Sequence, residues 1–187
     1  MGAMWEKLRT LKFGIRSRIV IAAIFFAIAL TATAVGTVTL RLDQGEAEDR
    51  ANELQDQFDR INDPVFIFGN NFALTLGMFV PAFGPIWGCF VLFQTGTVVA
   101  ILGIAEGMPP VLLLFALMFT PIFWMEFGVY AVAMAQSTIL LLQILRHSGK
   151  KEAVRTCIVI TACALVLLAA ALIEWGMINM VTPQILS

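Results

Sequence analysis

The stretch that decides the fold lies between residues 65 and 131, and its three apolar parts read VFIFGNNFALTLGMFV (65–80), GPIWGCFVLFQTGTVVAILG (84–103) and TPIFWMEFGVYA (120–131). Polar side chains interrupt all three parts: Asn70 and Asn71 the first, Gln94 the second and Glu126 the third. Polar and ionisable groups inside hydrocarbon are costly, so they normally face protein or a water-filled cavity. The stretch therefore predicts a membrane-embedded helical bundle with a polar seam, and it does not by itself indicate a reaction.

The composition of the whole chain agrees with this prediction. Of its 187 residues, 59% are hydrophobic and 13% are charged, and the mean hydropathy is +0.87. Soluble domains carry about 25% charged residues, and a bilayer-spanning helix needs roughly 20 mostly apolar residues. We expect one all-α, polytopic membrane domain over residues 1–187, with about five transmembrane helices. The expected spans are residues 19–40, 65–80, 84–103, 121–145 and 153–178.

Two basic segments predict the topology. Residues 1–18 carry five Lys or Arg residues beside apolar ones, which fits either an amphipathic helix on an anionic membrane surface or a tail that only stops transfer. A second basic cluster lies in residues 146–155. The positive-inside rule places both clusters in the cytoplasm, so we expect a cytoplasmic N-terminus and an extracytoplasmic C-terminus. The apolar run after residue 18 is too long for a signal peptide, and we read it as an uncleaved anchor.

Residues 41–64 differ sharply from the rest, because acidic side chains outnumber arginines there. Apolar residues recur at alternating steps of four and three, which is the spacing of a helix with a narrow apolar seam. The seam consists of Ala47, Ala51, Leu54, Phe58 and Ile61. We expect an acidic amphipathic helix outside the membrane, with Asp43 as its N-cap. It could be a connector resting on its own bundle, or it could dock a partner through Leu54, Phe58 and Ile61.

Pro121 divides an apolar run that is too long for one crossing. The run extends over residues 111–145. Proline lacks a backbone donor and clashes with the preceding turn, so it should end one helix and open the next. We expect a half-length interfacial or re-entrant helix over residues 111–119, followed by a full span from Pro121.

The topology places several polar side chains at related depths in the outer half of the bundle. This predicted intramembrane cluster contains Asn70, Asn71, Gln94, Glu126 and Glu174. We expect Glu126 to accept a hydrogen bond from Asn70 or Asn71. The cluster could be interhelical glue, worth about 0.5–2 kcal/mol per hydrogen bond, or a small polar site that carries a proton.

Glycines four residues apart favour close helix contacts. Gly84 and Gly88 have this spacing, as do Gly103 and Gly107. Small residues at such positions let helix backbones approach in lipid, and we expect packing within the chain rather than a dimer face.

The motifs of catalysis are missing from the sequence. His147 is the only histidine, and there is no GxSxG, P-loop or GxGxxG motif. Cys89, Cys157 and Cys163 lie in apolar spans without a CxxC pair and are read as buried small hydrophobes. We therefore expect no enzyme activity, no cofactor and no metal site, and the short basic clusters give no support for nucleic-acid binding.

The order of motifs resembles the stage II sporulation protein M family of membrane proteins. The resemblance covers roughly residues 66–145 and rests on Asn70-Asn71, a glycine-rich span with Thr95-Gly96, and Pro121 followed five residues later by Glu126. The family typically has Pro-His-Gly-x-x-Glu where this chain has PIFWME, so any role of that His does not transfer. In sporulating bacteria the resemblance implies a membrane scaffold that gathers cell-wall hydrolases.

Two function classes follow from these observations. The first is a non-catalytic membrane scaffold or accessory subunit that packs with other membrane or cell-envelope proteins, in a larger complex or as a homo-oligomer within the lipid bilayer. The second is a small transporter or channel that uses the outer polar cluster.

Overall fold

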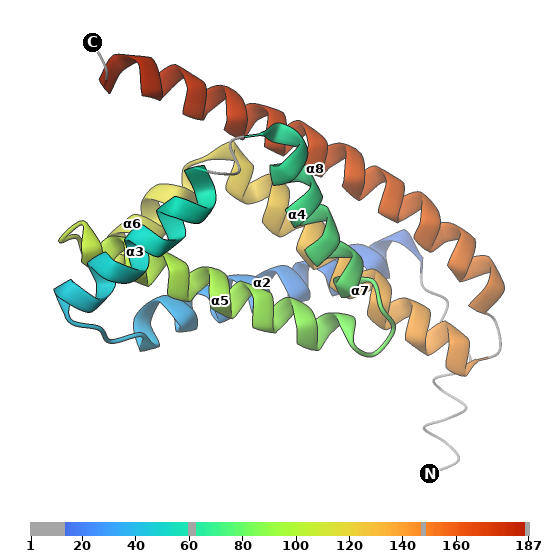
Figure 1. Ribbon diagram of the computed structural model, residues 1–187. Helices are drawn as coiled ribbons and strands as arrows, with labels where there is room; N and C mark the ends of the chain where they lie inside the picture. The colour runs from blue at the N-terminus through green and yellow to red at the C-terminus, as the bar shows by residue number, and fades with distance from the viewer. Residues whose placement is uncertain (1–13, 60–62, 147–148, 186–187) are drawn as a thin grey trace.

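The computed structural model describes residues 14–59, 63–146 and 149–185. Over these residues the chain forms seven α-helices, so the predicted all-α fold is confirmed (Figure 1). The helices are α2 (Ile15–Thr39), α3 (Gln44–Asp59), α4 (Pro64–Met78), α5 (Gly84–Ala105), α6 (Pro110–Met118), α7 (Pro121–Leu145) and α8 (Gly149–Ile185). Residues 1–13 of the basic N-terminal segment, Ile61 and His147 lie outside the described residues.

Four stretches among the described helices are long and apolar enough to cross a bilayer: α2, α5, α7 and the Glu152–Asn179 part of α8. They correspond to four of the five predicted spans. The remaining one, α4, is apolar but has only 15 residues. At 1.5 Å per residue it is about 22 Å long, which is shorter than the roughly 30 Å hydrocarbon core.

Local sequence signals explain where several helices begin. The Asp43 carboxylate accepts a hydrogen bond from the Glu46 amide at 2.8 Å, which confirms the predicted cap of α3. Asp63 caps α4 by accepting from the Val65 amide at 2.9 Å, and Pro64 follows as the first helical residue. Proline suits that position because the amide it lacks would have no helical partner there.

The predicted break at Pro121 is confirmed. The nine-residue helix α6 ends before it and α7 begins at it. Thr120 caps α7, its hydroxyl accepting from the Phe123 amide at 3.4 Å. The Trp124 indole N–H donates to the Met118 carbonyl at 2.7 Å, so a carbonyl left open at the end of α6 has a partner. The half-length helix is therefore anchored to the start of the following span.

The most extensive helix pair is α2 with α5, and glycines allow it. Both helices run from right to left in Figure 1, so they cross in parallel. A Cβ on Gly36 would lie 2.1 Å from the Phe93 carbonyl oxygen, and a Cβ on Gly96 would lie 2.1 Å from the Thr33 carbonyl oxygen. No side chain fits at either distance. The backbones therefore touch, which the small-residue argument allows.

The glycines singled out from the sequence also pack within the chain, as expected. A Cβ on Gly88 would lie 2.4 Å from the Met134 sulfur of α7, and Gly103 adjoins Pro110 at the start of α6. Gly107 differs, because it lies in the turn after α5 with a φ of +68°, a conformation that favours glycine.

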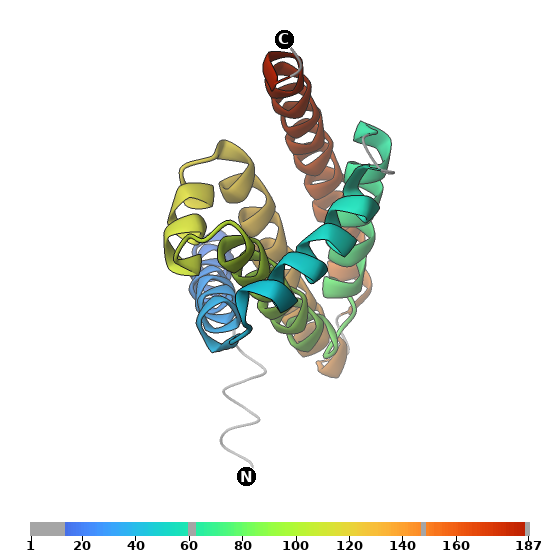
Figure 2. The same cartoon turned by 60° about the vertical axis from the view of Figure 1, so that its left-hand side comes forward.

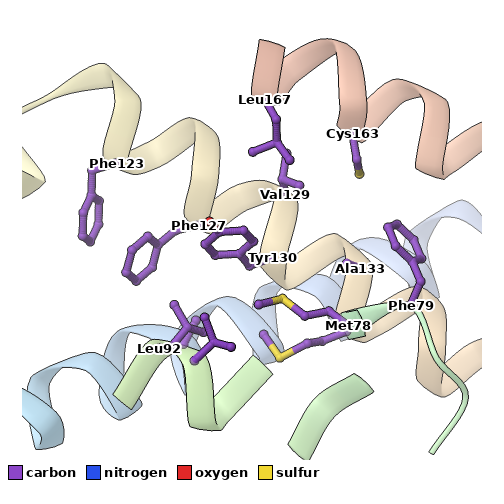
Figure 3. Packing of buried hydrophobic residues seen from close by; sticks show 13 residues of the cluster. Met78, Phe79, Leu92, Phe123, Phe127, Val129, Tyr130, Ala133, Cys163 and Leu167 are labelled. Atoms are coloured by element: carbon purple, nitrogen blue, oxygen red, sulfur yellow. The ribbon is translucent and has the colours of Figure 1, made fainter. Parts of the chain in front are cut away.

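The core lies where α4, α5, α7 and α8 meet. Figure 3 shows Phe127 and Tyr130 of α7 facing Leu92 of α5 and Met78 of α4, with Leu167 of α8 nearby. These side chains are buried. The rest of α8 continues past the bundle, because its 37 residues make it about 55 Å long. Figure 2 shows its C-terminal part projecting away from the other helices.

The acidic helix α3 lies against α5. Ala47 is fully buried, and Ala51 and Leu54 are half-buried. The acidic side chains of the opposite face are exposed: Glu46, Glu48, Asp49, Glu53 and Asp56. The apolar seam therefore rests on the chain's own bundle as far as Leu54, which supports the connector interpretation. The Phe58 side chain and Ile61 are outside the described structure, and docking through them stays a prediction.

Candidate functional site

The predicted bond between α4 and α7 is present. The Asn71 side-chain amide donates to the Glu126 carboxylate, with 2.5 Å between Nδ2 and Oε1. Asn71 is held in turn by its own helix, since the Thr75 hydroxyl donates to the Asn71 backbone carbonyl at 2.7 Å. Of the two adjacent asparagines, Asn71 is therefore the one that meets Glu126.

Glu174 of α8 and Tyr130 of α7 complete this group. Glu174 acts electrostatically on Glu126, and both carboxyls act on Tyr130. Tyr130 stands four residues after Glu126, so the two side chains lie on one face of α7. The helices α4, α7 and α8 are in mutual contact. We call Asn71, Glu126, Tyr130 and Glu174 the Glu126 cluster.

The sequence did not identify Tyr130. It is 5% exposed and makes no hydrogen bond to the residues that the structure describes. The available signal was its spacing from Glu126, together with its being the only tyrosine in the chain.

The other two predicted members lie elsewhere. Asn70 on α4 and Gln94 on α5 are exposed and do not join the Glu126 cluster. Neither side chain hydrogen-bonds to a described residue. The prediction grouped them by depth, but depth does not fix the side of the helix on which a residue lies. We call Asn70 and Gln94 the amide pair.

The amide pair lies on the faces that α4 and α5 turn toward each other. These helices meet where the Trp87 indole N–H donates to the Leu74 carbonyl at 3.2 Å. Asn70 is four residues before Leu74, and Gln94 is seven residues after Trp87, so each shares the face of its helix that makes this contact. Figures 1 and 2 show α4 and α5 converging at one end and separating toward the other. The separation leaves both amides exposed.

A second polar group, which the sequence did not predict, joins α2, α7 and α8. The Arg18 guanidinium donates to the Gln136 side-chain oxygen at 3.0 Å and to Glu152 at 2.8 Å. The Gln136 amide donates to Glu152 and to the Thr156 hydroxyl, each at 2.8 Å. We call Arg18, Gln136, Glu152 and Thr156 the Arg18 cluster.

The Arg18 cluster is largely buried, and each of its members is hydrogen-bonded to another. Gln136, Glu152 and Thr156 are at most 6% exposed. Arg155 also approaches Glu152, with 3.5 Å between nitrogen and oxygen. Charges survive burial when partners and hydrogen bonds compensate them, as here. The sequence feature that could have indicated this cluster is Glu152, a single acidic residue inside the second basic cluster.

Other predicted residues carry no site. All three cysteines are free: Cys163 is buried and Cys89 is half-buried, as expected for small hydrophobes. Cys157 is exposed, so it is not the buried residue that was expected. Among the described residues no group of three or more His, Cys, Asp or Glu side chains could hold a metal ion.

No match was found when the chain was compared with protein families, with curated proteins and with solved structures. The resemblance to the stage II sporulation protein M family therefore stays a prediction.

Proposed function

We propose that the protein is a non-catalytic membrane scaffold or accessory subunit, and that a transmembrane helix of another membrane protein packs against the amide pair. The observation that carries this proposal is the exposure of Asn70 and Gln94 on otherwise apolar helices.

Other exposed polar side chains of the spans provide the comparison. The side chains of Thr31, Thr39, Thr95, Thr161 and Asn179 are exposed as well, but each donates to a carbonyl four residues earlier in its own helix, at 2.7–3.1 Å. Asn70 and Gln94 have no such internal partner. An amide without a partner in hydrocarbon is costly. A neighbouring helix with a donor or acceptor removes that cost, with roughly 0.6–2 kcal/mol gained per interhelical hydrogen bond.

Large apolar side chains next to the amide pair extend the same surface. Phe66 is 49% exposed on α4, and Ile86 and Phe90 are 70% and 54% exposed on α5. Side chains of this size and type pack equally well against lipid and against a partner helix. The amides, in contrast, are satisfied by protein and not by lipid, so they select the partner helix.

The membrane orientation is part of the proposal. Arg18 contacts Glu152, so the start of α2 and the start of α8, which adjoin the two basic segments, lie together. The positive-inside rule then makes this the cytoplasmic end and places α3 on the extracytoplasmic side.

In this arrangement α4 is the short fifth span. The helix α4 runs parallel to α7, because two hydrogen bonds join them in the same order along both. Asn71 donates to Glu126 near the start of α7, and the Val80 carbonyl, just after α4, accepts from the Ser137 hydroxyl in the second half of α7 at 2.7 Å. We propose in addition that the chain belongs to the stage II sporulation protein M family, which is compatible with this arrangement of five spans.

The test is crosslinking in the native membrane. A photoreactive amino acid at Gln94 or Asn70 should crosslink to another polypeptide, and one at Thr31 is the matched control, because Thr31 is exposed but internally satisfied. Native mass analysis after gentle extraction then identifies the partner as a second copy or a different chain. Crosslinks no more frequent at Gln94 than at Thr31, together with a monomer mass, would refute the proposal.

A small transporter or channel is the second candidate, and the Glu126 cluster is the observation in its favour. The two candidates differ in their response to Glu126→Gln. If Glu126 only holds α4 to α7, Gln preserves function because it still accepts from Asn71, whereas Glu126→Leu costs about 1–3 kcal/mol by leaving the amide unpaired. If the cluster transports, Gln folds normally and flux in proteoliposomes is lost.

A further inference from the structure

One end of the bundle carries a surplus of positive charge. Figure 1 shows the beginning of α2, the end of α7 and the beginning of α8 at that end, on the right. The described charged residues of these three segments are four arginines and one acid: Arg16, Arg18, Arg146, Arg155 and Glu152. The single carboxylate can balance only one of the four positive charges. This end of the molecule therefore attracts anions.

Two of these arginines approach the same carboxylate. Arg18 holds Glu152 at 2.8 Å, and the Arg18 side chain is 18% exposed. Arg155 lies 3.5 Å from Glu152, which is longer than an ordinary hydrogen bond, and its side chain is 57% exposed. Among the described residues Arg155 has no other polar partner. Because Arg18 already balances the charge of Glu152, the N–H donors of Arg155 can bind a second anion.

The exposed face of α8 beside Arg155 is apolar. Val154 and Ile158 are each 65% exposed, and Leu165 and Leu172 are 64% and 52% exposed. Steps of seven residues, close to two helical turns, place Ile158, Leu165 and Leu172 in one line along the helix. A ligand that fits this surface therefore needs an anionic group for Arg155 and a long apolar chain for α8.

We propose that the start of α8 binds one anionic phospholipid, whose phosphate accepts hydrogen bonds from the Arg155 guanidinium and whose acyl chain lies along Ile158 and Leu165. A guanidinium matches a phosphate in geometry as well as in charge, and basic sites between membrane helices bind such headgroups. A soluble phosphate would leave the apolar face unused. The inference needs only that the spans lie in a bilayer, and it does not depend on the proposed packing of a partner helix.

Native mass spectrometry of the full chain with defined lipids tests the proposal. The protein, purified in a neutral detergent, is mixed with equal amounts of phosphatidylglycerol and phosphatidylethanolamine that have the same acyl chains. We expect one phosphatidylglycerol to be retained in preference to phosphatidylethanolamine. In Arg155→Gln the preference should fall roughly fivefold, the effect of one basic residue on an anionic lipid. This variant keeps the ion pair between Arg18 and Glu152, so we expect it to fold.

The matched control is Arg50→Gln, which removes the same charge from an exposed arginine on α3, at the other end of the bundle. It should leave the lipid preference unchanged. The proposal is overturned if the two lipids are retained equally, or if Arg50→Gln lowers the preference as much as Arg155→Gln does.

A second arm distinguishes a lipid from a soluble anion. Glycerol 3-phosphate has the phosphate of the headgroup but no acyl chains, so at the same concentration it should not displace the retained lipid. Phosphatidylglycerol with a photoreactive group in its acyl chain should label the α8 peptide that contains Ile158 and Leu165, and labelling should fall in Arg155→Gln. Displacement by glycerol 3-phosphate, or labelling that Arg155→Gln does not change, would overturn the proposal.

Discussion

Replacing Gly96 by Ala is the sharpest test of the α2–α5 crossing. The new Cβ would lie 2.1 Å from the Thr33 carbonyl oxygen and 2.9 Å from the Thr37 nitrogen. Both are backbone atoms, so no side-chain rotation relieves the clash. To reach ordinary contact α2 must move by roughly 1 Å, and overpacking of this kind costs about 1–3 kcal/mol.

The matched control is Gly128→Ala in the middle of α7. A Cβ at Gly128 meets nothing within 4 Å. There Ala should be neutral or stabilising by up to about 1 kcal/mol, because it is the better helix former. The two variants should therefore differ by about 2–4 kcal/mol in the free energy of unfolding. Combining Gly96→Ala with Gly36→Ala should cost less than the sum of the two, since one separation of the helices accommodates both methyl groups.

The measurement is reversible unfolding in mixed micelles with increasing dodecyl sulfate, followed by tryptophan fluorescence. Gly96→Ala with the same stability as Gly128→Ala would mean that the two backbones are not in contact at Gly96, and the close crossing of α2 and α5 would then be wrong.

Three further predictions concern other parts of the bundle. Glu152→Leu should cost about 3–5 kcal/mol in the free energy of unfolding because the largely buried Arg18 guanidinium loses the carboxylate that balances its charge, and adding Arg18→Leu should recover part of the loss; additive losses would contradict this. In a cysteine-free background, Cys at Asn52 should react with an impermeant thiol reagent from outside, and Cys at Ser148 only after the membrane is opened; the reverse pattern would invert the topology. Ala47→Asp should detach α3 from α5 and speed proteolysis within α3, by about tenfold for each 1.4 kcal/mol lost, whereas unchanged proteolysis would show that the contact is weak.

The long spans could be predicted from the sequence because length and hydropathy suffice for them. Four of the five expected spans correspond to helices of membrane-spanning length, and the proline break between α6 and α7 follows from the chemistry of Pro121. The fifth expected span, residues 65–80, forms the apolar helix α4, which begins after the Asp63 cap and ends at Met78. With 15 residues, α4 is shorter than a membrane-spanning helix, and hydropathy alone did not show this.

The candidate site was only partly predictable, because rotation about a helix axis is hard to read in a uniformly apolar helix. Depth grouped Asn71 with Glu126, and these two side chains are hydrogen-bonded. Asn70 and Asn71 differ by one residue, which is 100° of rotation, and nothing in the sequence selects between them. Gln94 has apolar neighbours on every side of α5, so its exposure could not be seen in advance.

The Arg18 cluster was missed for a different reason. Arg18 resembles a charge that stops membrane transfer at the end of a basic segment, and its partner lies 134 residues later in the chain. No local pattern connects two residues so far apart.

That same separation has a consequence for biosynthesis. At about 5–20 residues per second, the ribosome needs on the order of ten seconds to make the 134 residues between Arg18 and Glu152. During that time the first span is in the membrane while the counter-ion of its arginine has not been made, so the long side chain must reach the aqueous boundary for solvation. Only the arrival of the last span draws it inward. A nascent chain that stops before α8 therefore differs from the finished protein at Arg18, whose guanidinium is solvated by water instead of bound to Glu152.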